Sequence, residues 1–275
     1  MIEESSLIVE PWLIDLHCHL VPGVDDGAES IEDGLAALRA FRASGVRRVV
    51  TTPHLDAGHV RTSRHGRVEA AFARLAQAAS LEVPDVRLEL SYEIRIDDPE
   101  IDLSDPGIGL SAGGALLVEF PRLVLPAYSA QMLAVVQDRG WTPVLAHPER
   151  YAGIGPSYEW ILRWRDMGVI LCMNVGSLLG EHGREAQQVA RRMLTSGHAD
   201  LMGSDHHARP QRSTLLRRGR DFLAEGDDPA FAEAAELLTF RNPRAVLDGE
   251  PLAPVPALEM PSGWIDRICR KLLGS

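Results

Sequence analysis

The chain has 275 residues, 45% of them hydrophobic and 24% charged, which is the balance of a globular protein with a core and excludes a disordered or fibrous chain. Its 28 basic and 39 acidic residues leave a net charge of -11, which repels a polyphosphate backbone, so we expect no nucleic-acid partner. The three cysteines are an odd, widely spaced set, which excludes a disulfide framework or a Cys-x-x-Cys zinc site and indicates the reduced cytoplasm.

We expect no targeting or anchoring signal at either end of the sequence. The N-terminal MIEESSLIVEPWLI is acidic where a signal peptide would be basic, and no apolar run approaches the roughly 18 to 20 residues of a membrane span. No linker divides the chain, so we expect an N-terminal extension over 1–11, one domain over 12–250 and a tail over 251–275. The tail could form an amphipathic helix with Trp264, Ile265, Ile268 and Leu272 on one stripe, packed on the domain.

Short apolar or β-branched runs alternate with segments of helical periodicity along the chain. Seven strands are expected, at 12–16, 46–52, 86–93, 115–120, 142–147, 169–174 and 199–204. Helices are expected at 30–44, 65–80, 127–139, 156–167, 182–196 and 210–225, followed by a cap of helices at 229–240 and 243–248. Ser30 is the expected N-cap of the first helix, and glycines 45, 140, 168 and 197 are expected stops.

This alternation predicts a parallel sheet with crossover helices, either an open doubly wound sheet or a closed barrel. In both architectures, functional residues lie at the carboxyl ends of the strands. Every expected strand except that at 169–174 ends in a potential metal ligand. These ligands are His17 and His19 in DLHCH, His54 in TTPH, Glu93 in SYEI, Glu119 in LLVEF, His147 in LAHPER, and Asp205 and His207 in GSDHH.

The His-x-His pair can clamp one cation, because side chains two residues apart point to the same side of an extended strand. A mixed set of eight imidazoles and carboxylates is too large for one tetrahedral zinc, and carboxylates can bridge two ions. The pattern therefore indicates two or three metal ions. Glu119 follows an apolar run, where a cation would offset the cost of burying its charge.

Other residues near these motifs have less specific interpretations. Asp15 is expected to orient an imidazole, Asp25 to serve only the turn, and Cys18 to lie in the core. His206 faces away from its neighbours if the strand continues, and a role in supporting a metal ligand, a role in substrate binding, or neither remains open. The histidines outside the strand ends are expected on the solvated surface: His59, His65, His182 and His198.

A set of motifs carries a resemblance to a known family: DLHCHLVPGVDDG, TTPHLDAGH, EIRI, LLVEFPR, LAHPERY, NVGSLLGEHG, GSDHH and NPRAVLDGEPL. In this order and spacing, over about residues 13–252, the chain resembles the PHP superfamily. It resembles most closely the metal-dependent bacterial protein-tyrosine phosphatases of capsule and exopolysaccharide clusters.

The resemblance implies an α/β fold, specifically a PHP-type distorted (β/α)7 TIM-like barrel. It implies a centre of two or three divalent ions, usually described with manganese, although iron or zinc can occupy such sites. The eight strand-end residues would be the metal ligands, and Asp26 of VDDG and Arg150 of HPERY would be catalytic or phosphate-binding. The implied partner is a phosphotyrosine protein, the tail of a bacterial tyrosine kinase that controls polysaccharide export.

The favoured hypothesis is phosphomonoester hydrolysis by a water whose pKa the metal ions lower, with Arg150 holding the phosphate. Asp26 would protonate the leaving oxygen, provided that its pKa is raised. A cysteine nucleophile is excluded because no cysteine opens a Cys-x5-Arg loop. Three alternatives stay open: a histidinol-phosphate or other small-molecule phosphatase, a PHP-type phosphodiesterase or nuclease, and a metal-binding regulatory module without activity.

Overall fold

The computed structural model describes residues 12–56, 58, 63–110, 114–154, 158–209, 215–260 and 263, and the expected N-terminal extension and amphipathic tail helix lie outside these residues. Its strands are β1 (Leu13–Asp15), β2 (Val46–Thr51), β3 (His54–Asp56), β4 (Arg87–Leu90), β5 (Glu93–Arg95), β6 (Ala115–Glu119), β7 (Thr142–Ala146), β8 (Ile170–Asn174) and β9 (Leu201–Gly203).

The helices alternate with these strands. They are α1 (Ile31–Ala43), α2 (Ser63–Glu82), α3 (Ser129–Asp138), α4 (Glu159–Asp166), α5 (Val175–Leu179), α6 (Arg184–Thr195), α7 (Leu216–Ala224), α8 (Pro229–Glu236) and α9 (Asn242–Asp248). Shorter turns are η2 (Pro106–Ile108), η3 (Pro121–Leu123) and η4 (Pro148–Arg150), and a π-helical turn, η5 (Leu237–Arg241), joins α8 to α9.

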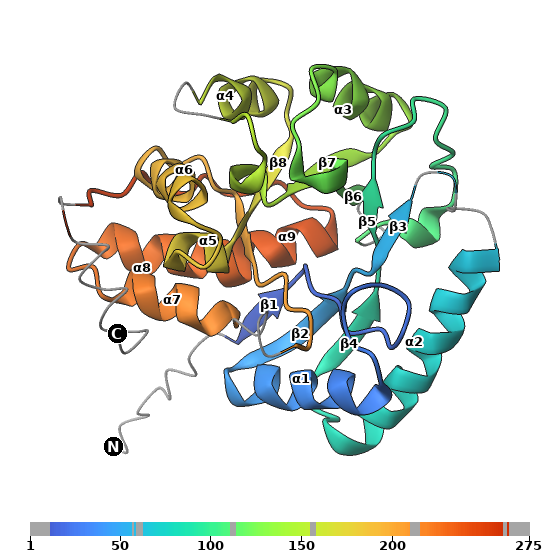
Figure 1. Ribbon diagram of the computed structural model, residues 1–275. Helices are drawn as coiled ribbons and strands as arrows, with labels where there is room; N and C mark the ends of the chain where they lie inside the picture. Colours follow the sequence, from blue (N-terminus) through green and yellow to red (C-terminus); the bar gives the residue numbers. More distant parts are fainter. Residues whose placement is uncertain are drawn as a thin grey trace, which may run out of the picture.

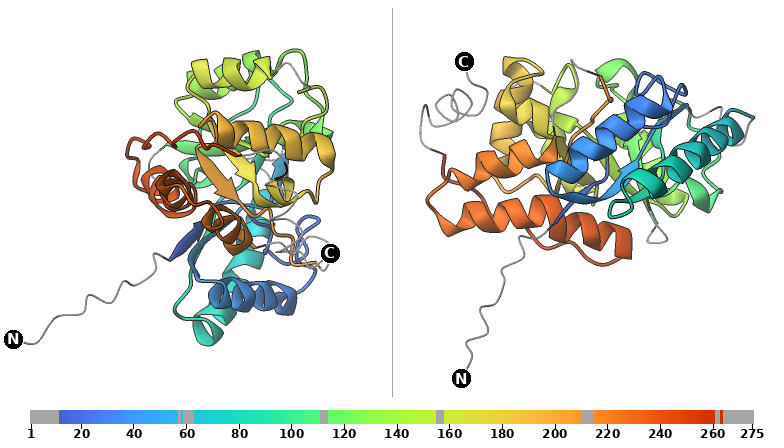
Figure 2. Two further views of the ribbon diagram at one scale, coloured as in Figure 1. Left: turned by 90° about the vertical axis from the view of Figure 1, so that its left-hand side faces the viewer. Right: turned by 90° about the horizontal axis from the view of Figure 1, so that it is seen from below.

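All strand pairs are parallel, and they form two sheets. The three-stranded sheet has the order β1-β2-β4, and the six-stranded sheet has the order β3-β5-β6-β7-β8-β9. Helices α1 and α2 lie on the side of the smaller sheet, and α3 and α4 on the opposite side of the molecule (Figures 1 and 2). The chain is therefore a mixed α/β protein with parallel sheets.

The described chain has nine short strands where seven were expected, because an additional strand, β3, follows the one expected at 46–52, and the strand expected at 86–93 is divided between β4 and β5. The β2 run stops at Thr51, and β3 begins at His54 after Pro53, which has no backbone N–H for a ladder. In the same way, the run expected at 86–93 ends at Leu90 and resumes as β5 at Glu93. Strand β2 pairs with β4 and β3 pairs with β5, so the two segments pass together from the three-stranded sheet to the six-stranded sheet.

The ends of the strand series also approach one another. An isolated parallel bridge joins Cys18 to His206, where the backbone N–H of His19 donates to the carbonyl of His206 over 2.7 Å. The N–H of Asp205 donates to the carbonyl of His17 over 2.8 Å. The segment after β1 therefore lies beside the segment after β9, although the two are far apart in the sequence.

Local signals set most helix boundaries as expected. Ser30 accepts from the backbone N–H of Asp33, whose carboxylate accepts from the Ser30 N–H, so the predicted N-cap is confirmed as a capping box. Glycines 45, 140, 168 and 197 all have positive φ, as helix-ending residues do. The short helix α5 was not expected, and α8, η5 and α9 follow one another without a loop.

Two buried clusters form the core. The larger cluster contains side chains from both helices and strands, and the smaller contains side chains from strands of both sheets, such as Ile14, Val50, Val144 and Cys172. Residues 251–260 pack on this body through Val255 and Leu258, both buried. None of the described helices combines the length and the apolar character that a membrane crossing needs.

Candidate metal centre

The carboxyl ends of the strands bring all eight predicted ligands into one cluster: His17, His19, His54, Glu93, Glu119, His147, Asp205 and His207. All are buried except His54, whose side chain is 12% exposed. His54 and Glu93 are the first residues of β3 and β5, which follow the carboxyl ends of β2 and β4. Two of the donors therefore lie where the chain passes from the three-stranded sheet to the six-stranded sheet.

The donors form four overlapping groups, and within each group the donor atoms lie within 4.8 Å of one another. The groups are His19, Asp26, His54 and His207; His17, His19 and Asp205; His17, Glu93 and His147; and His54, Glu93 and Glu119. Each group shares one member with the next, and the shared residues are His19, His17, Glu93 and His54. The groups therefore make one closed ring of donors, which suits several neighbouring cations better than one isolated ion.

The contact between His54 and Glu93 tests whether this ring fits metal ions. Nδ1 of His54 lies 3.0 Å from Oε2 of Glu93, yet the two atoms lack hydrogen-bond geometry. Among the described residues, neither of these buried atoms has any other hydrogen-bond partner. Buried polar atoms left in this way are costly, and an imidazole nitrogen and a carboxylate oxygen are both ordinary metal ligands. The donors present therefore fit divalent cations.

The charge balance of the cluster points the same way. Burial raises the pKa of Glu93, but the imidazoles of His17 and His54 outweigh burial and hold this pKa well below its usual range. Burial lowers the pKa of His54, yet Glu93 and the other carboxylates beside it raise the pKa to about 11. The buried carboxylates therefore attract positive charge, which either protons or metal ions can supply.

Two of the predicted ligands have strained backbones. His147 has a φ of 35° and Asp205 a φ of 52°, both in the left-handed region that residues other than glycine seldom adopt. Such strain costs on the order of 1–3 kcal/mol and persists where the surrounding structure fixes it. The cluster therefore has its geometry imposed by the fold around it.

Asp25 is the residue of the first loop that the sequence analysis missed. Its Oδ2 accepts from Nδ1 of His19 over 2.7 Å and from the backbone N–H of His54 over 3.1 Å. Burial raises the pKa of Asp25, but the charge of His19 and its hydrogen bond lower it to about 2. Asp25 therefore fixes the ring of His19 with Nε2 toward the donor cluster, and its interpretation as turn chemistry alone was wrong.

Asp15 does not have the imidazole partner that was expected. Its Oδ1 accepts from the backbone N–H groups of His17, at 3.2 Å, and Ser204, at 3.3 Å. The carboxylate therefore ties the backbones of the first and last strand ends together. The role expected for Asp15 belongs to Asp25.

The loop that carries Asp25 packs closely on His19. A Cβ added at Gly27 would lie 2.2 Å from the carbonyl oxygen of His19 and 2.5 Å from its Cβ. Only glycine permits this approach, since real Cβ contacts are never so short. Gly27 therefore holds VDDG against the donor cluster.

Asp26 lies at the open side of the cluster, with its side chain 56% exposed. Its Oδ1 is 3.4 Å from Nε2 of His54 and 3.3 Å from Nε2 of His207. The imidazoles of His207 and His54 beside it hold the pKa of Asp26 far below its usual range. The raised pKa on which its proton-donor role depends is therefore absent, because two imidazoles stabilise the carboxylate.

Arg150 contacts the cluster directly. Its Nη1 donates to Oδ2 of Asp205 over 2.6 Å, and Nδ2 of Asn174 donates to the same oxygen over 3.1 Å. Beside Arg150, the buried Glu149 accepts from the backbone N–H of Asn174 over 3.1 Å. Asn174, at the end of the one strand expected to carry no ligand, therefore positions both Asp205 and the η4 turn.

A small cavity of about 160 Å³ opens over the cluster. Besides Arg150, two arginines that the sequence analysis did not single out line it, Arg95 and Arg122. Arg95 donates to Glu119 over 2.8 Å and to Asp56 over 3.2 Å. Within the described part of the chain, Arg122 has neither an ion pair nor a hydrogen bond from its side chain, and its φ is 60°. The cavity therefore combines metal-type donors with cations that can bind an anion.

The remaining predicted residues lie outside the cluster. Cys18 is fully buried, as expected. The ring of His206 packs edge-on against Phe41, 5.1 Å between centroids, and belongs to none of the four donor groups. His182 and His198 are not simply solvated, since Nδ1 of His182 lies 2.9 Å from the Ser177 hydroxyl and the ring of His198 stacks on Tyr158. His59 lies outside the described residues.

The fold and the donor ring define an α/β protein with a candidate metal centre at the carboxyl ends of its parallel strands. Residues 13–248 match the model of the family described as capsular polysaccharide synthesis, CpsB/CapC. The chain therefore belongs to the CpsB/CapC family.

Relatives of known name agree with this assignment. Tyrosine-protein phosphatase YwqE of Bacillus subtilis is 29% identical over 197 residues, which are 71% of this chain and 77% of YwqE. Tyrosine-protein phosphatase CpsB of Streptococcus pneumoniae is 25% identical over 248 residues, 86% of this chain and 98% of CpsB. A crystal structure from work on these two proteins, described as unique metal-dependent tyrosine phosphatases, matches with a TM-score of 0.71 at 24% identity and covers 90% of this chain and 100% of that chain.

Proposed function

We propose that this protein is a metal-dependent protein-tyrosine phosphatase, a phosphoric monoester hydrolase that uses no cysteine nucleophile. One observation carries the proposal: a closed ring of histidine and carboxylate donors lies beneath a small cavity that is also lined by three arginines. The donors suit cations, and the arginines suit the phosphoryl oxygens of a substrate. Membership of the CpsB/CapC family and the names of the relatives support the same activity.

We propose two or three divalent ions, manganese in the first place and iron or zinc as alternatives. The eight predicted ligands would hold them, with His17, His19, His54 and Glu93 shared between neighbouring groups. When bound, the ions would supply charge neutralisation at the phosphoryl oxygens and a water of lowered pKa. The mixture of imidazole and carboxylate donors supports ions such as manganese over a single structural zinc.

The arginines would orient the phosphoryl group. Nη1 of Arg150 is engaged by Asp205, which fixes the planar guanidinium and leaves its other N–H groups to donate to phosphate. Arg122, which lines the same cavity, would also donate to the phosphate, since no described carboxylate neutralises it. Arg95, held by Glu119 and Asp56, would keep a positive charge beside the donors without needing to move.

Asp26 is proposed as an exposed member of the donor ring that faces the substrate. Its carboxylate form and its short distances to His54 and His207 support this placement over that of a proton donor. Asp26→Asn separates the two roles. A ring member loses activity equally on aryl and alkyl phosphates and retains less metal, whereas a proton donor loses more on alkyl phosphates, whose leaving group needs the proton.

We propose that the parallel sheets over residues 12–250 form a PHP-type distorted (β/α)7 TIM-like barrel. Counting β2 with β3 and β4 with β5, seven strands follow one another in chain order, which supports seven barrel positions. The Cys18–His206 bridge beside the first and last strands supports closure, as does the core cluster shared by the two sheets. The division into an extension over 1–11, this domain and a tail over 251–275 is proposed with it.

The proposed substrate is a phosphotyrosine protein, namely the tail of a bacterial tyrosine kinase that acts in polysaccharide export, and the proposed compartment is the cytoplasm. The family's role in capsular polysaccharide synthesis supports the substrate. Cys18 and Cys172, both buried free thiols, support a reducing compartment.

The test is a metal analysis of the purified protein together with a substrate panel. Protein stripped with a chelator is titrated with manganese, iron or zinc and assayed on a phosphotyrosyl peptide, histidinol phosphate and a nucleotide diester. We expect two or three ions per chain and the highest kcat/KM on the phosphotyrosyl peptide. Hydrolysis that survives complete chelation would contradict the proposal, and a preference for histidinol phosphate or the diester would replace the substrate class.

A further inference from the structure

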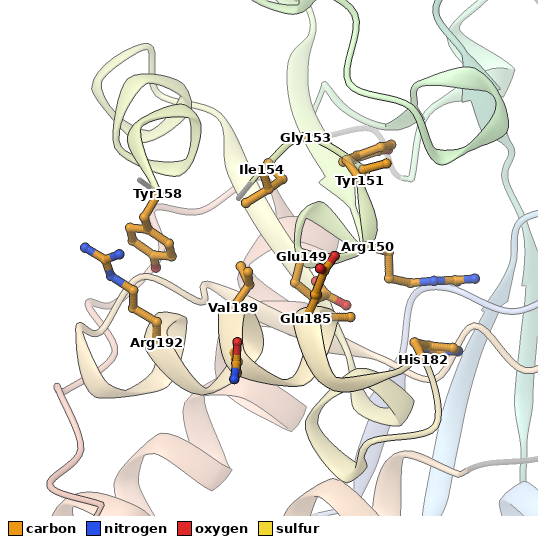
Figure 3. Close-up of a pocket in the computed structure, with 13 residues that line it drawn as sticks. Glu149, Arg150, Tyr151, Gly153, Ile154, Tyr158, His182, Glu185, Val189 and Arg192 are labelled. Atoms are coloured by element: carbon orange, nitrogen blue, oxygen red, sulfur yellow. The ribbon is translucent and has the colours of Figure 1, made fainter. Parts of the chain in front are cut away.

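A second, larger cavity of about 620 Å³ lies beside the small cavity, between the loop after β7 and helix α6. Figure 3 shows Arg150 and His182 at one end of it and Tyr158 and Arg192 at the other. We call this cavity the flanking groove. Its volume falls within the ~300–1,000 Å³ of typical ligand sites, whereas the small cavity of about 160 Å³ is below that range.

The two cavities meet at one residue. Arg150 lines both, and no other described residue is shared between the two linings. Since Arg150 contacts Asp205 of the donor cluster, a phosphoryl group in the small cavity would place the rest of its substrate at the entrance of the flanking groove. The groove therefore continues the proposed phosphatase site toward the part of the substrate that does not react.

The lining of the flanking groove is apolar in the middle and charged along the edge. Ile154 and Ala186 are buried and Val189 is half-buried, and together they offer an apolar surface. On α6, Glu185 stands nearer Arg150, and Arg192 stands seven residues further along the helix. The guanidinium of Arg192 lies 4.3 Å from the centroid of the Tyr158 ring, which holds it at the far end of the groove.

We propose that the flanking groove binds the polypeptide next to the phosphotyrosine, with an apolar side chain against Val189 and an acidic side chain at Arg192. This inference rests on the proposed function. Seven residues of helix span about 10 Å, and an extended peptide advances about 3.3 Å per residue. In the bound peptide, the acidic residue at Arg192 therefore lies about three residues beyond the residue that faces Glu185. An acidic peptide residue close to Glu185 is disfavoured, because the two like charges repel.

The first test blocks the groove. Val189→Arg places a long cation on the apolar surface, and Thr195→Arg adds the same charge to α6 at a residue that does not line the groove. Both variants, loaded with metal, are assayed on a short phosphotyrosyl peptide and on p-nitrophenyl phosphate, which is too short to enter the groove. We expect Val189→Arg to lower kcat/KM for the peptide at least about tenfold more than for the small substrate. Thr195→Arg should change both by the same small factor.

The second test exchanges charge between protein and peptide. A panel of phosphotyrosyl peptides carries a single glutamate or lysine at each position flanking the phosphotyrosine. The wild-type protein should prefer glutamate about two- to fivefold at one position, as exposed ion pairs allow, and Arg192→Glu should prefer lysine at that same position. This reversal depends on direct contact, since a variant that only damaged the fold would lose activity on every peptide alike.

Two outcomes overturn the proposal in distinguishable ways. If the wild-type protein hydrolyses p-nitrophenyl phosphate and the peptides, but Val189→Arg affects both substrates equally or Arg192→Glu leaves the charge preference unchanged, the groove is not the peptide site. If the metal-loaded wild-type protein hydrolyses neither substrate, the proposed function itself falls, and the groove proposal with it.

Discussion

Asp25 offers the most direct test of how the first loop supports the donor cluster. In Asp25→Asn, one amide oxygen replaces two carboxylate oxygens, yet three donors converge on this side chain: Nδ1 of His19 and the backbone N–H groups of His54 and Gly27. The amide –NH2 group must then face one of these donors. We expect the variant to bind metal less tightly and to be less stable.

The magnitude follows from the pKa. The Asp25 carboxyl has an ordinary pKa of 3.8 and is held at about 2 in the folded protein, and its side chain is only 2% exposed. This difference corresponds to about 2 kcal/mol of stability in the metal-free protein. Because the folded pKa is the lower one, this stabilisation is complete above about pH 4 and is lost as the pH falls toward 2. The variant should therefore differ from wild type at pH 7, and less so below pH 4.

The measurement is urea unfolding of chelated wild-type protein and Asp25→Asn at several pH values, followed by metal retention against a buffered chelator. Removing a residue that orients a ligand typically costs 10–100-fold in metal affinity. Asp138→Asn, at an exposed residue that ends α3, is the matched control and should change neither quantity. Equal unfolding midpoints at pH 7, combined with unchanged metal retention, would refute the role given to Asp25.

Three further substitutions test separate parts of the site. Gly27→Ala should lower the free energy of unfolding by about 1–3 kcal/mol, measured by thermal unfolding, and should weaken metal binding, because the added Cβ would overlap His19. A variant as stable and as fully loaded with metal as the wild type would contradict the close packing. Arg122→Ala should raise KM for p-nitrophenyl phosphate about tenfold, and Arg122→Lys should restore part of the loss. The control variant Arg139→Ala, at an exposed residue, should leave KM unchanged. A fall in kcat without a rise in KM would argue against phosphate binding by Arg122. Cys18→Ser should keep its activity, since burial raises the pKa of this thiol well above its usual value, and an inactive, folded variant would reopen cysteine chemistry.

The donor residues could be predicted because each follows a recognisable strand, and parallel strands bring their carboxyl ends together. His147 and Asp205 could be identified in this way although nearly sixty residues separate them. The same reasoning failed for the strand expected at 86–93, because side-chain pattern does not reveal which neighbour a backbone pairs with. The break after Leu90 arises because the segment before it, β4, pairs with β2, whereas the segment after it, β5, pairs with β3 and β6.

Roles within one motif were harder to predict than the motif itself. Asp15 and Asp25 are both aspartates close to His-x-His, and only the folded distances show that Asp25 reaches an imidazole while Asp15 reaches backbone N–H groups. The flanking groove carries no sequence signature, since Ile154 and Val189 are ordinary apolar residues until η4 and α6 pack side by side. Long-range packing of this kind cannot be read from local composition.

The bridge between Cys18 and His206 has a consequence for how the protein is made. The ring of donors closes only when the segment after β9 lies beside the segment after β1, and 188 residues separate His17 from Asp205. When His17, His19 and His54 have been synthesised, the segment that carries Asp205 and His207 has not, so no complete site exists. Pairing so distant in sequence is slow to form. The donor ring therefore cannot close before β9 and the segment after it have been synthesised.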